Sequence, residues 1–323
     1  MLRILVTGGC GYIGSAAARL LAREGHAVTV VDDLSEGHRQ AWDGELVVAD
    51  LLDEDAVRKL AQRRFDGVIH FAARAYVGES VQQPLRYWRA NLVPLIHLCA
   101  ALEGVPVVLS STCAVFGLPQ APALAEDHPQ APVNPYGATK AAAERLLADR
   151  AAAGQGAYAA LRYFNAAGAD ADGRHGEDHR PETHLIPRAI AAALGRAPAL
   201  TIYGADWDTP DGTCVRDFVH VEDLAAAHLR ALERLARGGS SGCWNLGTGR
   251  GHSVREVLGE VERALGAPVP WNGGPRRPGD PPYLVAQPAR ARADLSWQAR
   301  HDLPSIVASA VGWHRRHPNG YTP

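Results

Sequence analysis

The sequence predicts an α/β protein with a doubly wound parallel sheet and a second, smaller α/β part at the C-terminal end. In the first half, short apolar runs alternate with helical segments, a pattern typical of parallel strands covered by helices on both faces. A glycine-rich loop joins the first apolar run to the first helix. After about residue 166, proline, glycine and histidine become frequent, which indicates a change of architecture.

The elements are expected in a regular order along the chain. Their apolar and β-branched residues predict buried strands at 4–7, 27–31, 46–48, 67–71, 105–109 and 157–164. Helical periodicity predicts helices at 11–23, 53–60, 138–152, 185–194 and 221–237. The proline-rich segment 268–288 is expected to form a loop.

The bulk composition argues against several classes of protein. The 323 residues are 46% apolar and 21% charged, with a net charge of −2 and no basic block, so no nucleic-acid partner is expected. No apolar run is long enough for a membrane span, and a strand-like segment begins at Arg3 without a secretory signal, so a cytoplasmic location is expected. The five cysteines are scattered and form no Cys-x-x-Cys pair. We therefore expect no disulfide framework and no bound metal.

The loop after the first strand has the spacing of a dinucleotide-binding site. Gly8 allows a tight turn, Gly11 lets the backbone approach a pyrophosphate, and Gly14 lets the helix pack closely. The helix N-terminus offers free N–H groups and a partial positive charge to the phosphates. Asp32 ends the next strand, where a carboxylate can bind the adenosine ribose and repel a 2′-phosphate. These residues predict a Rossmann-type site for NAD rather than NADP.

Two further strand ends bear on this site. Asp50-Leu51 follows the third strand, and the aspartate is either a contact to the adenine amino group or an ordinary helix N-cap. Phe71, Ala72 and Ala73 end the fourth strand, where small residues suit a backbone that lies against the dinucleotide. His70 is expected to be a packed strand residue rather than a ligand.

Tyr136 and Lys140 form a Tyr-x-x-x-Lys motif at the start of an alanine-rich helix. Residues four apart lie on one face of a helix. A phenol is a poor base at neutral pH, but a nearby ammonium and a positively charged nicotinamide would lower the pKa of the tyrosine. Tyr136 can then take a proton from a substrate hydroxyl while hydride leaves the same carbon. Lys140 is one of only two lysines in the chain.

Ser110, Ser111 and Thr112 follow the strand at 105–109. A hydroxyl at this strand end faces the region where the cofactor and Tyr136 are expected to meet, and it can hydrogen-bond the reacting oxygen. The alternative is simple capping of the strand end, which applies more to Ser110 than to Thr112.

Together these motifs resemble the extended short-chain dehydrogenase/reductase superfamily, and within it the UDP-glucose 4-epimerases. The resemblance runs over nearly the whole chain. It includes the segments 8–15, 32–35, 77–81, 134–140, 161–165, 176–178, 185–187, 211–213, 215–221 and 276–280, together with Asn91. The blocks at 215–221 and 276–280 are much more specific than the glycine loop.

The resemblance implies 4-epimerisation of a UDP-hexose, UDP-glucose or UDP-galactose, with NAD as a resident cofactor. Tyr136 would abstract the proton of the 4-hydroxyl, C4 would give hydride to NAD, the 4-keto sugar would turn, and hydride would return to its opposite face. Thr112 would bind the 4-oxygen. Lys140 would hold the nicotinamide ribose and tune Tyr136.

The motifs and the resemblance together give two sets of expected contacts. The residues expected to contact NAD are Gly8, Gly11, Tyr12, Ile13, Gly14, Asp32, Asp33, Leu34, Ser35, Asp50, Leu51, Phe71, Ala72, Ala73, Asn91, Ser110, Tyr136, Lys140 and Tyr163. The residues expected to contact the UDP-sugar are Thr112, Tyr136, Asn165, His184, Leu185, Tyr203, Arg216, Arg277 and Asp280. Two arginines suit a diphosphate because their fork geometry matches phosphate oxygens, although each taken singly is compatible with a surface ion pair.

Three residues depart from the family pattern. Ala75 stands where some members carry a cofactor-contacting lysine, so retention of NAD is in doubt. His184 replaces an asparagine found in some members. Leu284 stands where residues of differing size gate the sugar 2-position, and leucine leaves open whether N-acetylated sugars enter.

The sequence argues against some, but not all, of the other functions that occur on the same scaffold. A 4,6-dehydratase needs an acidic pair after the hydroxyl residue, and Cys113-Ala114 stands there instead. Decarboxylation of UDP-glucuronate and 4-epimerisation of UDP-N-acetylhexosamines or UDP-pentoses stay open. An inactive NAD-sensing regulatory protein would be expected to lack Tyr136 or Lys140, and both are present.

The organisation expected from these arguments has two parts. Residues 1–165 would bind NAD, with a segment near 214–245 returning to this part, and residues 166–323 would bind the UDP-sugar. The resemblance also implies a homodimer through the helices that follow Asn91 and Tyr136.

Overall fold

The computed structural model describes residues 1–277 and 279–321, so Pro278 of the 276–280 block lies outside the described residues. In this part of the chain, seven parallel strands form one sheet in the order β11-β6-β5-β4-β1-β2-β3. They are β1 (Arg3–Thr7), β2 (Ala27–Asp32), β3 (Glu45–Val48), β4 (Gly67–His70), β5 (Val107–Thr112), β6 (Tyr158–Tyr163) and β11 (Gly242–Leu246). The strand order reverses between β1 and β4, as in a Rossmann-type sheet. The predicted fold class is confirmed.

Alternate residues of the strands pack against helices on opposite faces of the sheet. Ile4 and Val6 of β1 face α1 (Tyr12–Arg23) and α7 (Val221–Ala236). Leu5 faces the other side, which is covered by α2 (Glu54–Ala61), α4 (Pro84–Ala101) and α5 (Pro135–Ala152). All three strand residues are completely buried. Burial on both faces explains why these strands are continuous apolar runs in the sequence.

A late segment of the chain completes this sheet. β11 pairs in parallel with β6 at the sheet edge, and α7, which precedes it, packs beside α1. The helix α9 (Ala289–Leu295) lies against β11 and α7. We call the sheet and these helices, together with α3 (Val77–Gln82), the sheet region.

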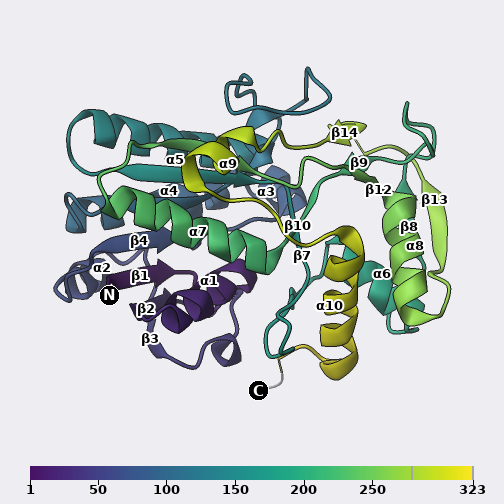
Figure 1. The fold of residues 1–323 in the computed structure, drawn as a ribbon, viewed down its shortest axis with the longest axis horizontal. Helices are drawn as coiled ribbons and strands as arrows, with labels where there is room; N and C mark the ends of the chain where they lie inside the picture. The colour runs from purple at the N-terminus through teal and green to yellow at the C-terminus, as the bar shows by residue number, and fades with distance from the viewer. Residues whose placement is uncertain (278, 322–323) are drawn as a thin grey trace.

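The remaining elements form a second region with its own core (Figure 1). Ile190, Val257 and Val307 are completely buried where three helices meet. These helices are α6 (Leu185–Ala193), α8 (Val254–Leu265) and α10 (Leu303–Arg316). Short strands line this region: β7 (Asn165–Ala167) pairs with β10 (Phe218–His220), β8 (Leu200–Tyr203) pairs with β13 (Trp271–Gly274), and β9 (Val215–Arg216) lies between β12 (His252–Ser253) and β14 (Tyr283–Leu284).

Three element boundaries differ from the sequence-based expectation. The prediction of a loop over 268–288 was wrong, because β13 and β14 pair there with strands far away in the chain, which local proline and glycine signals do not report. β5 continues to Thr112 instead of ending at residue 109. α5 begins at Pro135, because the Asn134 side chain caps it by accepting the Gly137 N–H (2.8 Å) and proline suits a first helical turn.

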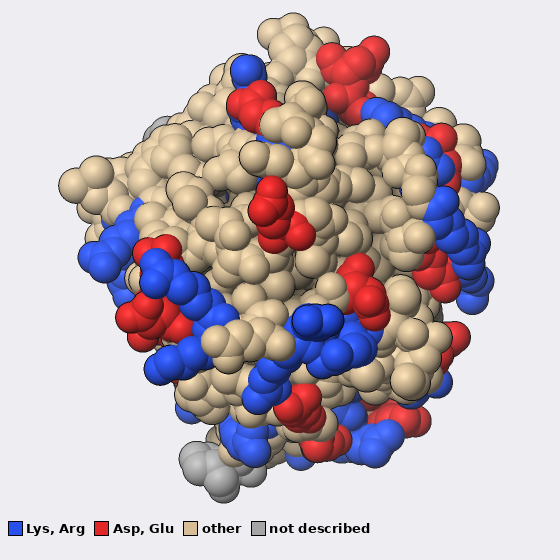
Figure 2. All heavy atoms as spheres, turned by 90° about the vertical axis from the view of Figure 1, so that its left-hand side faces the viewer, with Lys and Arg blue, Asp and Glu red and all other residues tan. Residues whose placement is uncertain are grey.

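The surface carries both signs of charge. On the face drawn in Figure 2, Lys and Arg side chains lie among Asp and Glu side chains and do not form one continuous basic area. In the described part of the chain, no helix combines the length and the apolar character that crossing a membrane requires.

Candidate active site

Many of the residues predicted to bind the cofactor, and the predicted catalytic residue Thr112, lie at the carboxyl ends of the parallel strands. In a doubly wound sheet this edge, near the point where the strand order reverses, is where ligands bind. The chain supplies there the glycine loop after β1, Asp32 at the end of β2, Phe71 after β4, Thr112 at the end of β5 and Tyr163 at the end of β6. The site is therefore assembled from strand ends, with the N-termini of α1 and α5 beside them.

The glycine loop leaves no room for side chains at two positions. Gly8 has φ +66°, and a Cβ there would lie 2.6 Å from the backbone nitrogen of Ala72. A Cβ on Gly14 would lie 2.2 Å from the carbonyl oxygen of Gly8. The first turn of α1 therefore rests on the glycine turn itself, and its N–H groups stay open towards the strand ends. This is the kind of cradle a pyrophosphate requires.

Asp32 is held in a fixed orientation beside this loop. It is 8% exposed, and its two carboxylate oxygens accept the N–H groups of Cys10 (2.9 Å) and Leu34 (2.8 Å). Burial raises the pKa of Asp32 in spite of these bonds. The next turn is closed by Asp33, which accepts the backbone N–H and hydroxyl of Ser35. Each oxygen of Asp32 keeps a further lone pair for a ribose hydroxyl.

The structure separates two alternatives at the neighbouring strand ends. His70 is 1% exposed and its Nδ1 lies 2.7 Å from the Thr7 hydroxyl, so its prediction as a packed strand residue is confirmed. The N-cap of α2 is Asp53, whose side chain accepts two backbone N–H groups, so an N-cap role for Asp50 was wrong. Asp50 instead accepts the N–H of Leu52 and is exposed. Its adenine contact stays a prediction.

Tyr136 and Thr112 come together through the start of α5 and the end of β5. The Thr112 hydroxyl lies close enough to the Tyr136 phenol to lower the pKa of that phenol. The same threonine oxygen accepts the N–H of Ala114 (3.1 Å), which fixes its position. The strand-end capping and the contact with Tyr136 thus coexist in one residue.

Lys140 lies one helical turn further, almost completely buried. Its Nζ donates to the carbonyl oxygen of Ser110 (2.8 Å), and burial lowers its pKa to about 8. The Ser110 hydroxyl is hydrogen-bonded to the phenol of Tyr163, which is opposite Thr112 in the pairing of β5 with β6. One strand end thereby holds both members of the Tyr-x-x-x-Lys motif.

The expected lowering of the Tyr136 pKa requires a bound nicotinamide beside the ammonium, so it stays a prediction. Burial raises the pKa of Tyr136 to about 12, and the hydrogen bond from Thr112 offsets only part of that rise. In the chain alone, the ammonium of Lys140 donates to the Ser110 carbonyl. A lower pKa therefore needs an additional positive charge next to the phenol.

Asn91 on α4 uses its amide within the protein. Its oxygen accepts the N–H of Arg74 (2.8 Å), and its nitrogen donates to the Arg74 carbonyl and to the Thr139 hydroxyl. It thereby ties the loop after β4 to the first turn of α5. This geometry gives Asn91 a role in positioning the site, and a direct cofactor contact stays a prediction.

A buried ion pair behind the site escaped the sequence reasoning. Glu144 and Arg162 are 4% and 5% exposed and lie 2.7 Å apart. Glu144 also accepts the hydroxyl of Ser111 (2.5 Å) and the side-chain amide of Gln130. Glu144 follows Lys140 by four residues on the same helix, and this spacing was the available signal.

The second region pairs several of the predicted substrate residues from distant segments. Arg216 on β9 pairs with Asp280 (3.1 Å), and Leu284 is the partner of Arg216 in the β9–β14 pairing. The Arg277 guanidinium lies 3.9 Å from the centre of the Tyr203 ring. The charge of Arg216 lowers the pKa of the Cys113 thiol against the larger effect of burial, so the arginine is close to the strand end that carries Thr112.

Asn165 adds an unused acceptor on β7. Its side-chain oxygen is buried and has no hydrogen-bond partner within the described residues. A buried polar atom without a partner is costly unless a ligand or a water satisfies it. The structure thus leaves at this predicted substrate residue a group that is ready to bind.

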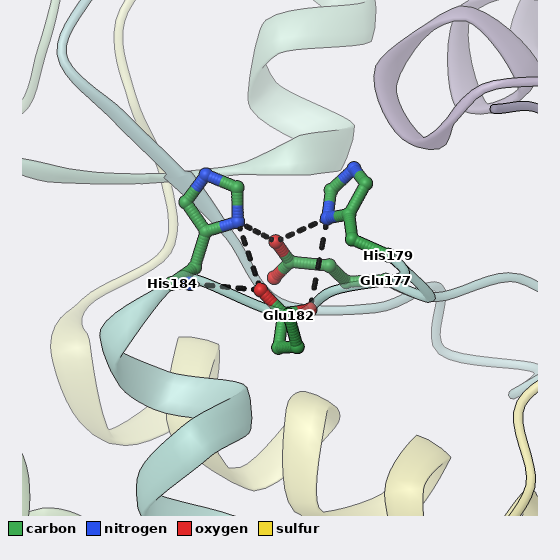
Figure 3. Close-up of side chains that lie close together, drawn as sticks. All are labelled: Glu177, His179, Glu182 and His184. Atoms are coloured by element: carbon green, nitrogen blue, oxygen red, sulfur yellow. Dashed lines mark hydrogen bonds and ion pairs between the residues drawn. The ribbon is translucent and has the colours of Figure 1, made fainter. Parts of the chain in front are cut away.

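The predicted residue His184 belongs to a group that the sequence reasoning did not assemble. It occupies the N-cap position of α6, directly before Leu185, and lies in the Glu–His cluster formed by Glu177, His179, Glu182 and His184 (Figure 3). Although burial favours neutral rings, the two carboxylates raise the pKa of His179 to about 9 and that of His184 to about 10. The close spacing Glu-x-His-x-x-Glu-x-His was visible in the sequence.

The loop that carries this cluster is fastened to the start of α1. The Tyr12 hydroxyl donates to the carbonyl oxygen of Gly168 (2.5 Å). The His175 ring stacks on Tyr12, and its Nδ1 lies 3.0 Å from the Ser15 hydroxyl. Tyr12, a predicted cofactor residue, therefore also joins the sheet region to the second region.

Comparison with known proteins places this geometry in a family. Residues 4–247 match the model of the NAD dependent epimerase/dehydratase family. The chain belongs to this family. A UDP-glucose 4-epimerase of Azospirillum brasilense is 48% identical over 97% of this chain and 92% of its own length.

Solved structures of family members share the whole fold. A UDP-glucose 4-epimerase from Brucella ovis, in complex with NAD, is 47% identical, with a TM-score of 0.93 over 96% of this chain and 97% of its own. One from Bifidobacterium longum, in complex with NAD+ and UDP, is 34% identical, with a TM-score of 0.92 over 98% and 99% of the two chains. The resemblance inferred from the motifs is confirmed, and the roles of individual site residues stay predictions.

Proposed function

We propose that this family member catalyses NAD-dependent 4-epimerisation of a UDP-hexose, interconverting UDP-galactose and UDP-glucose. The observation that carries the proposal is the meeting of the Thr112 and Tyr136 hydroxyls beside the buried Lys140, at the strand ends next to the glycine loop. The names of the relatives and the ligands of the solved neighbours support the same activity. Accordingly, the sheet region would bind NAD and the second region the UDP-sugar.

The glycine cradle and Asp32 fit NAD. A side chain at Gly8 or Gly14 would collide with backbone atoms, so the loop keeps its N–H groups accessible to a diphosphate. Asp32 has lone pairs left for the ribose hydroxyls and would repel a 2′-phosphate. When bound at these residues, NAD supplies a reversible acceptor for the hydride of the sugar C4.

Tyr136 and Thr112 move the proton in this proposal. Tyr136 takes the proton of the 4-hydroxyl as the C4–H bond breaks and returns it after the keto sugar has turned. Thr112 donates a hydrogen bond to the same oxygen or to the phenol, so it keeps the two oxygens close enough for the proton to pass between them. With the chain alone, the pKa of Tyr136 is raised to about 12. Its action as a base therefore depends on the positive charge that arrives with the cofactor.

Residues of the second region would hold the UDP-sugar. Arg216 and Arg277 offer planar forks of N–H donors to a diphosphate, and Asp280 orients the first of them. The free oxygen of Asn165 supplies an acceptor for a sugar or base N–H or O–H group. Leu284 lies beside Arg216 in the strand pairing, where its bulk would meet the sugar ring.

Retention of NAD is the property that Ala75 puts in question. Ala75 is exposed, and the neighbouring Arg74 is already paired with Glu36 (3.2 Å) and Glu79 (3.3 Å). No spare cation is thus supplied by Arg74 in place of the lysine that some family members carry. We expect part of the NAD to leave on extensive dilution or dialysis, which absorbance of the protein before and after dialysis would measure.

A homodimer is part of the proposal. Apolar side chains on α3 and α4 are exposed although they would suit a covered surface: Val81 (62%), Leu85 (82%), Trp88 (39%) and Ile96 (47%). Exposed apolar groups gathered on neighbouring helices are typical of a contact between proteins. Light scattering at micromolar concentration should give twice the monomer mass of 34.5 kDa, and a monomer mass would contradict the dimer.

A cytoplasmic location is also proposed. All five cysteines are free thiols in the structure, as suits a reducing compartment. Expression of a tagged protein in its own cells, followed by fractionation, tests this point.

The function is tested by a panel of UDP-sugars followed by NMR. We expect UDP-galactose to be converted to UDP-glucose by inversion at C4, without release of a keto sugar. The same panel distinguishes the substrates that Leu284 leaves open, since UDP-N-acetylhexosamines and UDP-pentoses are assayed beside the hexoses. Binding of NAD without conversion of any UDP-sugar would overturn the proposal in favour of an NAD-sensing protein.

A further inference from the structure

The Glu–His cluster gathers four potential metal ligands in one place. Two are imidazole Nδ1 atoms and two are carboxylate oxygens, and all lie within 4.8 Å of one another. Both rings turn Nδ1 towards the carboxylates, and their other nitrogens point away (Figure 3). Imidazole combined with carboxylate is a donor set that suits Zn²⁺ and neighbouring transition metals.

The distances within the cluster are close to those between the ligands of a tetrahedral cation. Metal–ligand bonds of about 2.0–2.1 Å separate the ligand atoms of a tetrahedron by about 3.3–3.4 Å. Glu177 Oε1 lies 2.6 Å from His184 Nδ1 and 3.2 Å from His179 Nδ1. Glu182 oxygens lie 3.1 Å and 3.6 Å from the same two nitrogens. Along these four contacts, adjustments below about 1 Å would place the donors around a cation.

The cluster lacks the basic side chains that usually neutralise buried carboxylates. Within the described residues, the ion pairs of Glu177 and Glu182 all go to His179 or His184. Arg180, which lies between them in the sequence, reaches instead to Asp178 (3.4 Å) and the carbonyl of Asn319. His179 Nδ1 is enclosed and lies close to both carboxylates, yet it makes no well-formed hydrogen bond. A divalent cation would satisfy both carboxylates and this nitrogen together.

The cluster is buried on one side and open to solvent on the other, so a cation could enter and then be partly enclosed. Glu177 is 4% exposed at the back of the cluster, and His184 is 46% exposed at the front. A hollow of about 440 Å³ opens beside them, with Glu177, His179 and Glu182 in its lining. The rings of Tyr12 and Tyr76 stand edge-on to His179, with centroids 6.2 Å and 6.0 Å away. The hollow has room for an entering ion and for a water ligand.

We propose that the Glu–His cluster binds one divalent transition-metal cation of the Zn²⁺ class. The cation joins residues 177–182 to His184, the N-cap of α6, and so closes the loop that Tyr12 fastens to α1. Glu182 accepts the N–H groups of Thr183 and His184, which offsets the positive end of the helix. The role of the bound cation is to order this loop next to the cofactor site. The sequence-based expectation of no metal had considered the cysteines, and this site uses none.

A second histidine group supplies a matched control. His220, Glu222 and His301 also lie within ligand distance of one another. There, however, both ring nitrogens of His220 are engaged, by the N–H of Glu222 and by the Ser309 hydroxyl (3.1 Å each). His301 is likewise hydrogen-bonded to Asp223. These nitrogens are not free for a metal, so a variant of His301 should bind a cation as the unmodified protein does.

The test is a titration of the full-length protein, stripped with a chelator, with Co²⁺ followed by visible absorption. Zn²⁺ is then added to displace the Co²⁺. We expect one Co²⁺ per chain and displacement by one Zn²⁺. The variant His179→Gln/Glu182→Gln should bind at least 100-fold more weakly, and His301→Gln should bind normally. Far-UV circular dichroism of each variant reports whether it is folded.

Several outcomes would overturn the proposal. One is the absence of saturable Co²⁺ or Zn²⁺ binding below millimolar concentration in the unmodified protein, which leaves the cluster as protonated histidines paired with glutamates. The others are unchanged binding in the double variant and loss of binding in His301→Gln. The first outcome is measured on the unmodified protein alone, so the proposal can be overturned even if a variant does not fold. None of these measurements depends on epimerase activity.

Discussion

The sheet region and the second region bring their functional residues together in different ways. In the sheet region, Ser110 and Lys140 meet because a strand ends and a helix begins at one edge of a parallel sheet. In the second region, Arg216 and Asp280 are 64 residues apart, and only the first of them lies in a strand, which has two residues. The first arrangement is fixed by regular structure that a short motif already specifies. The second depends on pairings between distant segments.

This difference suggests that the sheet region carries the chemistry and the second region recognises the substrate. The polar groups of the sheet region are buried and bonded to one another, as in the chain from Lys140 through Ser110 to Tyr163. Those of the second region are more exposed, and Asn165 still has a free acceptor. Changes in the sheet region should therefore affect turnover or stability. Changes in the second region should affect substrate affinity.

The largest effect is expected for Tyr136→Phe. Removal of the phenolic oxygen takes away the general base, so kcat should fall at least about 1,000-fold, as is typical for the loss of a positioned proton acceptor. NAD binding should persist because the glycine cradle is untouched. Steady-state kinetics and an NAD titration measure the two quantities. Tyr158→Phe, at the far end of β6, is the control, and near-normal turnover of Tyr136→Phe would remove this residue from the proposed role.

The next effect concerns stability in the sheet region. Glu144→Gln leaves the buried Arg162 without its counter-charge, which should lower the free energy of unfolding by about 3 kcal/mol. Urea unfolding measures it. The exposed pair Arg145–Asp149 on the same helix is the matched control, since Asp149→Asn should change stability by less than about 0.5 kcal/mol. Equal effects of the two substitutions would show that burial is not the deciding factor.

The residues behind these two predictions differ in whether they could be identified from the sequence alone. The sequence alone predicted Gly8, Asp32, Tyr136 and Lys140. Each lies at a fixed number of residues from the end of a strand or helix, and such spacings can be read directly from the sequence. Glu144 and Arg162 lie 18 residues apart, on a helix and a strand, and only the packing of α5 on the sheet brings them together. The direction of the Lys140 ammonium could not be predicted for a related reason, because the motif shows the spacing of the lysine but not that its Nζ donates to the Ser110 carbonyl.

In the second region, local sequence patterns indicated less of the structure. The proline-rich segment 268–288 looked like loop, although β13 and β14 form there by pairing with β8 and β9. Arg216, Arg277 and Asp280 were named through the family resemblance and not through any local pattern. The Glu–His cluster had a visible spacing, but its convergence depends on the turn between Glu177 and α6.

A smaller effect is expected in the second region. Arg216→Ala should raise KM for the UDP-sugar about 30-fold, equivalent to about 2 kcal/mol, because charge-assisted hydrogen bonds to the diphosphate are lost. kcat should change little. Arg276→Ala, which removes an exposed arginine paired with Asp206, is the control with an unchanged KM. A fall in kcat at constant KM would place Arg216 with the chemistry instead of with recognition.

The smallest effect is a gain of stability on loss of a functional charge. Burial lowers the pKa of Lys140 from 10.5 to about 8, so between these values the unfolded chain binds more protons than the folded one. The unfolding free energy of the unmodified protein should therefore rise with pH from about 8 to about 10.5. At pH 7, Lys140→Met removes a charge-burial cost of about 3 kcal/mol but leaves the Ser110 carbonyl unpaired, a loss of about 2 kcal/mol.

The net result at pH 7 should be a variant about 1 kcal/mol more stable and nearly inactive. Urea unfolding of nucleotide-free protein at pH 7 and pH 10 measures this, and the advantage of the variant should shrink or reverse at the higher pH. A variant that is less stable at both pH values would contradict a charged, buried Lys140.

The central claim is that hydride leaves and returns to the same sugar carbon while NAD stays on the protein. UDP-galactose carrying deuterium at C4, incubated with the protein in ordinary water and analysed by NMR and mass spectrometry, tests it directly. We predict UDP-glucose that retains the deuterium at C4 with inverted configuration. Loss of the label to water, its appearance at another position, or no conversion by protein that holds NAD would contradict the account.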